Sequence, residues 1–270
     1  MLRTRILTAV ILACILLACL FLLPPASTVV MFGAVFTVGA WEWAGFGALT
    51  GAAARMAYAA GVALLLFLGW RWSADPAHLL LLLGAACVWW VFALLWMSLA
   101  PSRHQPMLAL LCGLPVLIPA CIAVARLQIA TRGFASGPQA VLWLVLMVIA
   151  ADIGAYFAGR SLGRRKLAPR VSPGKTVEGA LGGLSMVALV AGCGAVYFGL
   201  PPLTVVLFGV VVGIFSIVGD LTESMFKRAA GLKDSGALLP GHGGLLDRID
   251  SVTAAAPLYA LGLFGAGVIA

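Results

Sequence analysis

Long apolar runs, separated by short polar stretches, dominate the chain from end to end. A helix of about 20 apolar residues crosses the hydrocarbon core of a bilayer, so each run of that length predicts a transmembrane helix. Pro and Gly occupy most of the junctions, as expected at turns. The third run is short, which leaves open whether it crosses fully. The predicted helices are 6–23, 29–50, 56–70, 77–99, 107–125, 138–158, 177–199, 203–219 and 252–270.

The composition favours a membrane protein over a soluble one. Of the 270 residues, 63% are hydrophobic and only 10% are charged, whereas a soluble domain carries about 25% charged residues. So little charge cannot coat a globule of this length, and lipid must solvate much of its surface. We therefore predict an all-α integral membrane protein of about nine transmembrane helices. Glycines spaced four apart, such as Gly179 and Gly183, predict close helix packing within the chain.

The basic residues predict the orientation of these helices. Of the 17 Lys and Arg, all except Arg71, Arg126 and Arg132 fall at the N-terminus or in loops on its side of the predicted membrane. The positive-inside rule then places the N-terminus in the cytoplasm and the C-terminus outside. Basic loops beside anionic lipid also account for the net charge of +8. No nucleic-acid recognition motif accompanies that charge, so no nucleic-acid partner is expected.

The acidic residues divide the chain into two functional parts. All of them except Glu42 and Asp75 lie after residue 150, at or near predicted cytoplasmic helix ends or loops. Acids near hydrocarbon are costly and commonly mark a site. We therefore predict an N-terminal scaffold over 1–137, with about five spans. Residues 138–270 are predicted to form the catalytic region, with about four spans and the cytoplasmic loops.

Two pairs of acids flank the loop between the last two predicted helices. Asp220 and Glu223 are three residues apart, as are Asp247 and Asp250, so each pair shares one face of a helix. Carboxylate oxygens without His or Cys suit Mg²⁺, which binds through one or two carboxylates plus substrate phosphates. The alternative is a network of salt bridges, with the acids paired to neighbouring Lys and Arg residues. Spacing alone leaves both interpretations open.

The polar positions of this segment also match a known pattern. They read Ser224-x-Phe226-Lys227-Arg228-x4-Lys233-Asp234-x-Gly236-x2-Leu239-Pro240-x-His242-Gly243-Gly244-Leu245-x-Asp247-Arg248-Ile249-Asp250. An earlier stretch agrees, with Asp152-x2-Ala155-Tyr156-x2-Gly159-Arg160, Leu167-Ala168-Pro169 and Ser172-Pro173-Gly174-Lys175-Thr176-x-Glu178-Gly179. Both resemble the phosphatidate cytidylyltransferase family, also called CDP-diacylglycerol synthases. The clear resemblance covers residues 150–255, and the N-terminal half is similar only in being a set of apolar spans.

The resemblance implies an activity and roles for particular residues. The activity is transfer of CMP from CTP to phosphatidic acid, giving CDP-diacylglycerol and pyrophosphate for phospholipid biosynthesis. The implied setting is a bacterial inner membrane with the site facing the cytoplasm, and the implied assembly is a homodimer. The implied catalytic residues are Asp220, Asp247, Lys227, Arg228, Lys233 and Arg248. The implied Mg²⁺ ligands are Asp220, Asp247, Asp250 and Glu223. The implied substrate-binding residues are Ser172, Lys175, Thr176, Ser224, His242, Gly243 and Gly244, although the two glycines and His242 also suit a purely structural turn.

Two other functions are compatible with an apolar chain of this kind. A CTP-dependent polyprenol kinase would transfer the γ-phosphate to a lipid alcohol, and it would need a general base. An ion-coupled transporter would need inverted repeats or polar residues at the membrane midplane, whereas these carboxylates gather at one face. The match over 224–250 favours the synthase over both alternatives.

Overall fold

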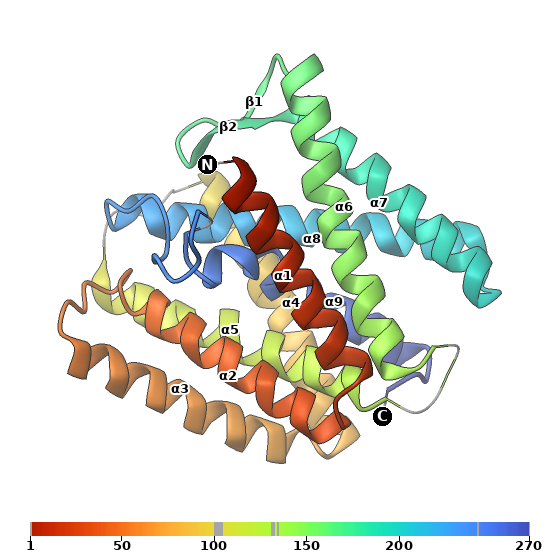
Figure 1. The fold of residues 1–270 in the computed structure, drawn as a ribbon, viewed down its shortest axis with the longest axis horizontal. Coiled ribbons are helices and arrows are strands. Elements are labelled where there is room, and N and C mark those ends of the chain that lie inside the picture. The colour runs from red at the N-terminus through yellow and green to blue at the C-terminus, as the bar shows by residue number, and fades with distance from the viewer. Residues whose placement is uncertain (1, 100–104, 131–132, 134, 242, 270) are drawn as a thin grey trace.

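The computed structural model describes residues 2–99, 105–130, 133, 135–241 and 243–269, and within these ranges the chain is mostly helical (Figure 1). A short hairpin and a 3₁₀ turn are the other regular elements of the described chain. The α-helices are α1 (Leu2–Phe21), α2 (Pro25–Trp43), α3 (Ala52–Trp72), α4 (Pro76–Leu99), α5 (Pro106–Gln128), α6 (Gly137–Leu162), α7 (Val177–Phe198), α8 (Pro202–Ala229) and α9 (Asp250–Gly265). The hairpin strands are β1 (Lys166–Ala168) and β2 (Ser172–Thr176), and the 3₁₀ helix is η1 (Leu246–Arg248).

Every predicted span corresponds to a helix, which confirms the predicted helical class. In the part of the chain that the structure describes, six helices, α3 to α8, are long and apolar enough to cross a membrane, and they include α3, the helix of the short third run. The 16-residue α9 is shorter than a usual crossing. The described chain begins beside the hairpin and ends near the start of α6, at the other end of that helix (Figure 1). The number of crossings and their direction stay predictions.

Helix α8 extends well beyond its predicted end at residue 219. It continues to Ala229 because its apolar face continues, with Leu221, Met225 and Phe226 all buried at helical spacing. The polar residues between them hide this periodicity from a search for uninterrupted apolar runs. The extension places Asp220 and Lys227 on one rigid helix.

A two-stranded antiparallel hairpin between α6 and α7 was not predicted. Strands β1 and β2 pair Lys166 with Thr176 and Ala168 with Ser172. The second strand leads directly into α7, where the Thr176 hydroxyl accepts a hydrogen bond from the backbone N–H of Gly179 at 3.1 Å. This N-cap satisfies one of the free donors at the start of the helix. The hairpin is therefore held rigidly to one end of the helical bundle.

Glycines bring α6 and α7 into backbone contact. A Cβ added at Gly183 would lie 2.6 Å from the carbonyl oxygen of Ala151, and one added at Gly179 would lie 2.9 Å from that of Ala155. Both distances are shorter than ordinary van der Waals contact, so only glycine fits without displacement. The predicted role of these two glycines in packing within the chain is confirmed.

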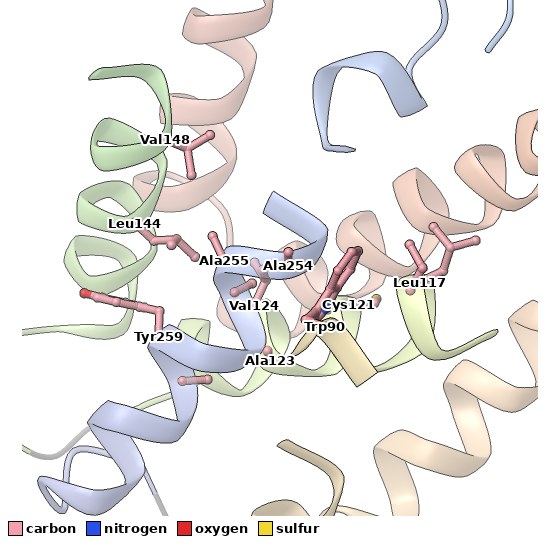
Figure 2. Close-up of a cluster of buried hydrophobic side chains, with 14 of the residues drawn as sticks. Trp90, Leu117, Cys121, Ala123, Val124, Leu144, Val148, Ala254, Ala255 and Tyr259 are labelled. Carbon is pink, nitrogen blue, oxygen red and sulfur yellow. The ribbon is translucent and has the colours of Figure 1, made fainter. Parts of the chain in front are cut away.

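Helix α9 lies at the centre of the molecule, surrounded by α4, α5, α6 and α8 (Figure 2). Its alanines 254, 255, 256 and 260 are fully buried. Ala254 and Ala255 lie near large side chains such as Trp90 on α4 and Leu144 on α6 (Figure 2). Small residues on the central helix let its neighbours approach closely, as is common where lipid removes the hydrophobic drive between helices. Helix α9 begins at Asp250, so this acid stands at the edge of the buried core.

Candidate functional site

A cavity of about 490 Å³ opens at the hairpin end of the bundle, between α6, the start of α7 and α8. Its volume falls in the range of ligand pockets, about 300–1,000 Å³. It differs from the apolar interior because acids and bases line it together. The polar lining includes Asp152, Tyr156, Arg160, Lys175, Asp220 and Ser251.

Lys175 and Asp220 meet across this cavity and form an ion pair. Lys175 comes from β2 and Asp220 from α8, so the pair joins the hairpin to the bundle. The Ser224 hydroxyl, one turn along α8, donates to Oδ1 of Asp220 at 3.4 Å. About a quarter to a third of each charged side chain is exposed, 30% for Lys175 and 24% for Asp220. Both groups can therefore exchange this partner for a ligand: an anion at Lys175 or a cation at Asp220.

The predicted phosphate-binding residues Ser172 and Thr176 lie on β2 with Lys175, and of these two Thr176 lines the cavity. The Thr176 oxygen also caps α7. Ser172 is half-buried at the start of β2. Glu178, in the first turn of α7, accepts hydrogen bonds from the backbone N–H groups of Arg164 and Arg165, at 2.9 and 3.1 Å. These bonds secure the base of the hairpin and so the position of Lys175.

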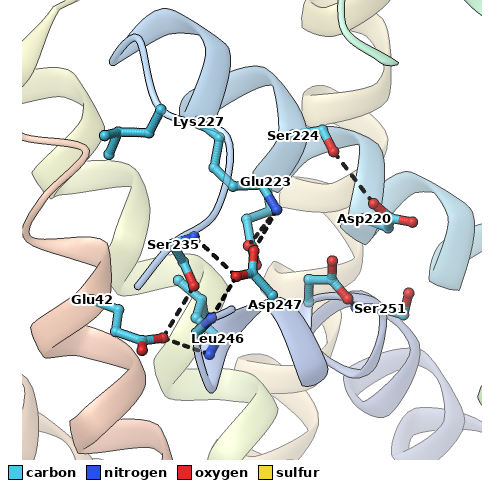
Figure 3. Close-up of polar contacts among 12 residues, drawn as sticks. Glu42, Asp220, Glu223, Ser224, Lys227, Ser235, Leu246, Asp247 and Ser251 are labelled. Atoms are coloured by element: carbon cyan, nitrogen blue, oxygen red, sulfur yellow. Dashed lines mark hydrogen bonds and ion pairs between the residues drawn. The ribbon is translucent and has the colours of Figure 1, made fainter. Parts of the chain in front are cut away.

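A buried ion-pair network lies further along α8 from Asp220, among residues outside the cavity lining (Figure 3). The Lys227 ammonium lies 3.1 Å from Oε1 of Glu223 and 2.7 Å from Oδ1 of Asp247. The three side chains are 9%, 3% and 6% exposed, respectively. In this arrangement the charge of Lys227 neutralises two carboxylates of the protein itself. Glu223 and Asp247 therefore form salt bridges with Lys227, as the alternative interpretation of the acid pairs predicted.

Asp247 also organises the loop that precedes it. Its Oδ2 accepts hydrogen bonds from the backbone N–H groups of Ser235, at 3.0 Å, and Gly244, at 2.8 Å (Figure 3). Partial burial raises the pKa of this carboxyl, but the hydrogen bonds from Lys227, Gly244 and Ser235 outweigh burial and hold the pKa below its ordinary value. Asp247 is thus ionised at neutral pH and acts as the anchor of the loop.

The loop has a second carboxylate anchor that was not among the predicted site residues. Glu42, near the end of α2, is 2% exposed. Its oxygens accept hydrogen bonds from the Ser235 hydroxyl at 3.1 Å, from Leu245 N–H at 3.1 Å and from Leu246 N–H at 2.7 Å (Figure 3). The available signal was a lone carboxylate inside an apolar run, which is costly unless it has a specific partner. Its partners lie about 200 residues further along the chain, so no local pattern in the sequence identifies them.

The predicted metal ligands do not form a ready-made cage. Asp250, the first residue of α9, accepts a hydrogen bond from the N–H of Ser251 at 2.6 Å and interacts electrostatically with Asp220 and Glu223. Within the described ranges, no three His, Cys, Asp or Glu residues lie close enough together to hold a metal ion. The carboxylates nevertheless offer only hard oxygen donors, and Asp220 faces the cavity. This set fits Mg²⁺ held by one or two carboxylates and completed by substrate phosphates.

The remaining predicted basic residues lie on the surface around the loop. Arg228 is exposed and donates to the carbonyl oxygen of Leu232 at 3.1 Å. Lys233 and Arg248 are also exposed. The charge of Arg248 acts on Asp152, an acid on the α6 wall of the cavity that belonged to the matched pattern but not to the predicted site.

The glycine-rich turn packs against protein rather than against open space. Gly243 has a φ of +81°, which favours glycine. Gly244 is buried, and a Cβ there would lie 2.6 Å from Oε2 of Glu42 and also collide with Ser235. Since its N–H already bonds Asp247, Gly244 has a structural role in this arrangement. His242, the third residue predicted in this turn, lies outside the described residues.

Comparison with known proteins assigns the chain to a family. The model of the "Cytidylyltransferase family" matches residues 3–264. The chain is 39% identical to the phosphatidate cytidylyltransferase of Haemophilus influenzae, with 96% of this chain and 97% of that protein covered. It is 43% identical to the phosphatidate cytidylyltransferase of Pseudomonas aeruginosa, over 99% of this chain and 98% of that protein. The similarity thus extends well beyond the resemblance found over 150–255, and the chain belongs to the cytidylyltransferase family.

Proposed function

We propose that this protein is a phosphatidate cytidylyltransferase, which joins CTP and phosphatidic acid to give CDP-diacylglycerol and pyrophosphate. The observation that carries the proposal is the cavity in which Lys175 and Asp220 meet, at the ends of membrane helices, in a chain that matches phosphatidate cytidylyltransferases along almost its whole length. Both substrates are phosphates, and a site for them needs cationic groups close to carboxylates that can share a cation.

The chemistry asks the protein mainly for positioning and charge neutralisation. An oxygen of the lipid phosphate attacks the α-phosphorus of CTP, the bond from that phosphorus to the β-phosphate bridging oxygen breaks, and pyrophosphate leaves. The attacking oxygen is already ionised at neutral pH, so no general base is required. The barrier arises from bringing two polyanions together, and fixed cations and aligned reactants lower it. Charged groups held by helices and a tied hairpin suit this task.

The cavity supports a division of roles among its residues. Lys175 and Arg160 bind phosphate oxygens, and binding at Lys175 releases Asp220 from its ion pair. Lys227 acts from outside the cavity lining, where it holds Asp247 and Glu223 in place. The exposed Arg228, Lys233 and Arg248 attract the triphosphate from solution and steer it toward the cavity.

We also propose a Mg²⁺ requirement, with Asp220 as the leading ligand. Asp220 faces the cavity, and the charges of Asp250 and Glu223 act in the same region. Asp247 stays a candidate ligand, although Lys227, Ser235 and Gly244 already occupy its two oxygens. When bound, Mg²⁺ would supply positive charge to the phosphoryl oxygens of CTP.

The proposed setting is the bacterial inner membrane, with the cavity on the cytoplasmic side. The chain is an integral membrane protein, and the distribution of basic residues supports this orientation. Phosphatidic acid then enters from the bilayer while CTP arrives from the cytosol. A tag inserted at 161–170 should be protected from outside reagents, and a tag after Ala270 should be accessible. Accessibility of both tags from one side would contradict the nine-span arrangement.

The homodimer implied by the family resemblance stays part of the proposal. Mass measurement of the protein in detergent, with the bound detergent subtracted, would test it. A mass of one chain at concentrations that support full activity would exclude the dimer as the working form.

The activity is tested with purified protein in mixed micelles. We expect pyrophosphate to be released from CTP only when phosphatidic acid is added, together with a CMP-bearing lipid in equal amount. Polyprenol should not replace phosphatidic acid. Formation of CDP with a phosphorylated lipid alcohol would instead establish a polyprenol kinase. The absence of any lipid product would contradict both enzyme activities and favour an ion-coupled transporter.

A further inference from the structure

Two carboxylates from distant parts of the chain hold one short backbone segment between them. The N–H groups of residues 244, 245 and 246 are consecutive donors: the first bonds Asp247 and the next two bond Glu42. Ser235 links the same two carboxylates, because its N–H donates to Asp247 and its hydroxyl donates to Glu42. Hydrogen bonds to an ionised acceptor are shorter and stronger than neutral ones. The segment is therefore fixed from both sides.

The Glu42 carboxylate packs closely against two glycines of the loop. A Cβ added at Gly236 or Gly244 would collide with the Glu42 carboxylate. Next to it on α2, Trp43 packs against Phe226 of α8, with ring centroids 5.2 Å apart. The end of α2 thus contacts both the loop and the helix that carries Asp220.

A continuous set of contacts connects Glu42 to the reaction site. The segment bonded by Glu42 ends at Asp247, which bonds Lys227 at 2.7 Å. Lys227 also pairs with Glu223, less than one helical turn from Asp220 on α8. Since α2 belongs to the part of the chain predicted as scaffold, these contacts tie that scaffold to the cavity.

We propose that Glu42 is a positioning residue for the cytidylyltransferase reaction: from the N-terminal scaffold it fixes residues 235 and 244–246, and through them Asp247 and Lys227. The inference rests on the proposed function for its activity readout. Glu42 touches no substrate in this account and acts only through the loop. The scaffold thereby takes part in catalysis instead of only filling the membrane.

The test compares Glu42→Gln with a matched control on the same helix. Glu42→Gln keeps the shape but removes the charge and replaces one acceptor with a donor that faces N–H groups. Thr28→Val is the control, since Thr28 is also fully buried on α2 and its hydroxyl donates to the Cys19 carbonyl at 2.7 Å, at the other end of the helix. Turnover per folded molecule and peptide-resolved hydrogen exchange are measured for both and for the wild type.

For Glu42→Gln we expect kcat to fall on the order of 10- to 100-fold, the usual cost of losing a group that orients an active site. Exchange should accelerate in the peptide covering 235–247 and stay unchanged in α4 and α6. Thr28→Val should change neither. Wild-type kcat in Glu42→Gln, or faster exchange spread evenly over the molecule, would overturn the inference.

Ser235→Ala keeps the proposal testable if Glu42→Gln does not fold. It removes only the hydroxyl that donates to Glu42, and we expect a smaller loss of kcat, on the order of 3- to 10-fold, with faster exchange in the same peptide. Unchanged kcat and unchanged exchange would count against the role of Glu42. An inactive wild type would contradict the proposed function instead, while the exchange measurements would still decide whether Glu42 holds the loop.

Discussion

Replacing Lys227 by Met should destabilise the folded protein far more than the same change at Lys175. Both lysines form ion pairs with acids of α8, and both substitutions remove one positive charge from a similar aliphatic stem. The difference is burial. Lys227 lies between two acids that are almost inaccessible, whereas Lys175 and its partner Asp220 remain partly in water.

The size of the effect follows from what each change leaves behind. Lys227→Met leaves Glu223 and Asp247 buried without their shared cation, and an uncompensated buried charge costs about 3–5 kcal/mol. At about 2–4 °C per kcal/mol, this predicts a fall in melting temperature of about 6–20 °C. Lys175→Met breaks a partly solvated pair, worth about 0–1 kcal/mol. Its melting temperature should fall by no more than about 4 °C.

Thermal unfolding in one detergent at pH 7, followed by tryptophan fluorescence, measures both variants. Turnover is measured on the fraction that remains folded. Lys175→Met should lose affinity for the anionic substrates while keeping its stability. A double variant, Lys227→Met with Glu223→Gln, should recover part of the lost stability, because one of the two unpaired charges is removed.

Equal melting temperatures for Lys227→Met and the wild type would refute the buried network as a source of stability. A drop in Lys175→Met as large as that in Lys227→Met would refute the distinction between the solvated pair and the buried pair. Further loss of stability in the double variant would show that the acids are not held by Lys227.

Three further predictions concern the acids and the glycine turn. Asp220→Asn should lower turnover about 10²-fold and raise the Mg²⁺ concentration needed for half-maximal rate, which a Mg²⁺ titration measures. Its free energy of unfolding should change by less than about 1 kcal/mol, which a melting curve measures. Because the pKa of Asp247 is held below its ordinary 3.8, its stabilisation is complete above that pH and is lost as the pH falls below it. The melting difference between wild type and Asp247→Asn should therefore stay constant from pH 7 to 5 and shrink below pH 3.8, and a gap that closes near neutrality would contradict this. Gly244→Ala should cost about 1–3 kcal/mol because its methyl group meets Ser235 and Glu42, whereas Gly51→Ala, where nothing lies within 4 Å, should stay within about 0.5 kcal/mol in the same unfolding assay.

The helices were predictable because a membrane helix needs a long apolar run, and such runs are visible in one sequence. A predicted helix end was wrong where polar residues interrupt the apolar run although the helix continues. Helix α8 continues past 219 on one buried face, marked by Leu221 and Met225, although its other face is charged. The hairpin over 166–176 has strands too short for a periodic pattern, and it depends on Thr176 and Glu178 for its anchoring.

The acids over 220–250 pointed to a polar region around the end of α8 and the start of α9, but not to the partners within it. That this region is the reaction site stays a prediction. Which acid meets which base depends on how the helices pack, and spacing says nothing about contacts as distant as Lys175 with Asp220. Glu42 shows the same limit most clearly, because its partners lie in a loop about 200 residues further along the chain.

The fate of the phosphorus atoms of CTP tests the central claim most directly. Purified protein is given phosphatidic acid and CTP labelled either at the α-phosphate or at the γ-phosphate, and the lipid and aqueous products are separated. We predict that the α-label appears in the lipid together with cytidine, and that the γ-label appears only in pyrophosphate. A γ-label in the lipid, with CDP released, would contradict the account.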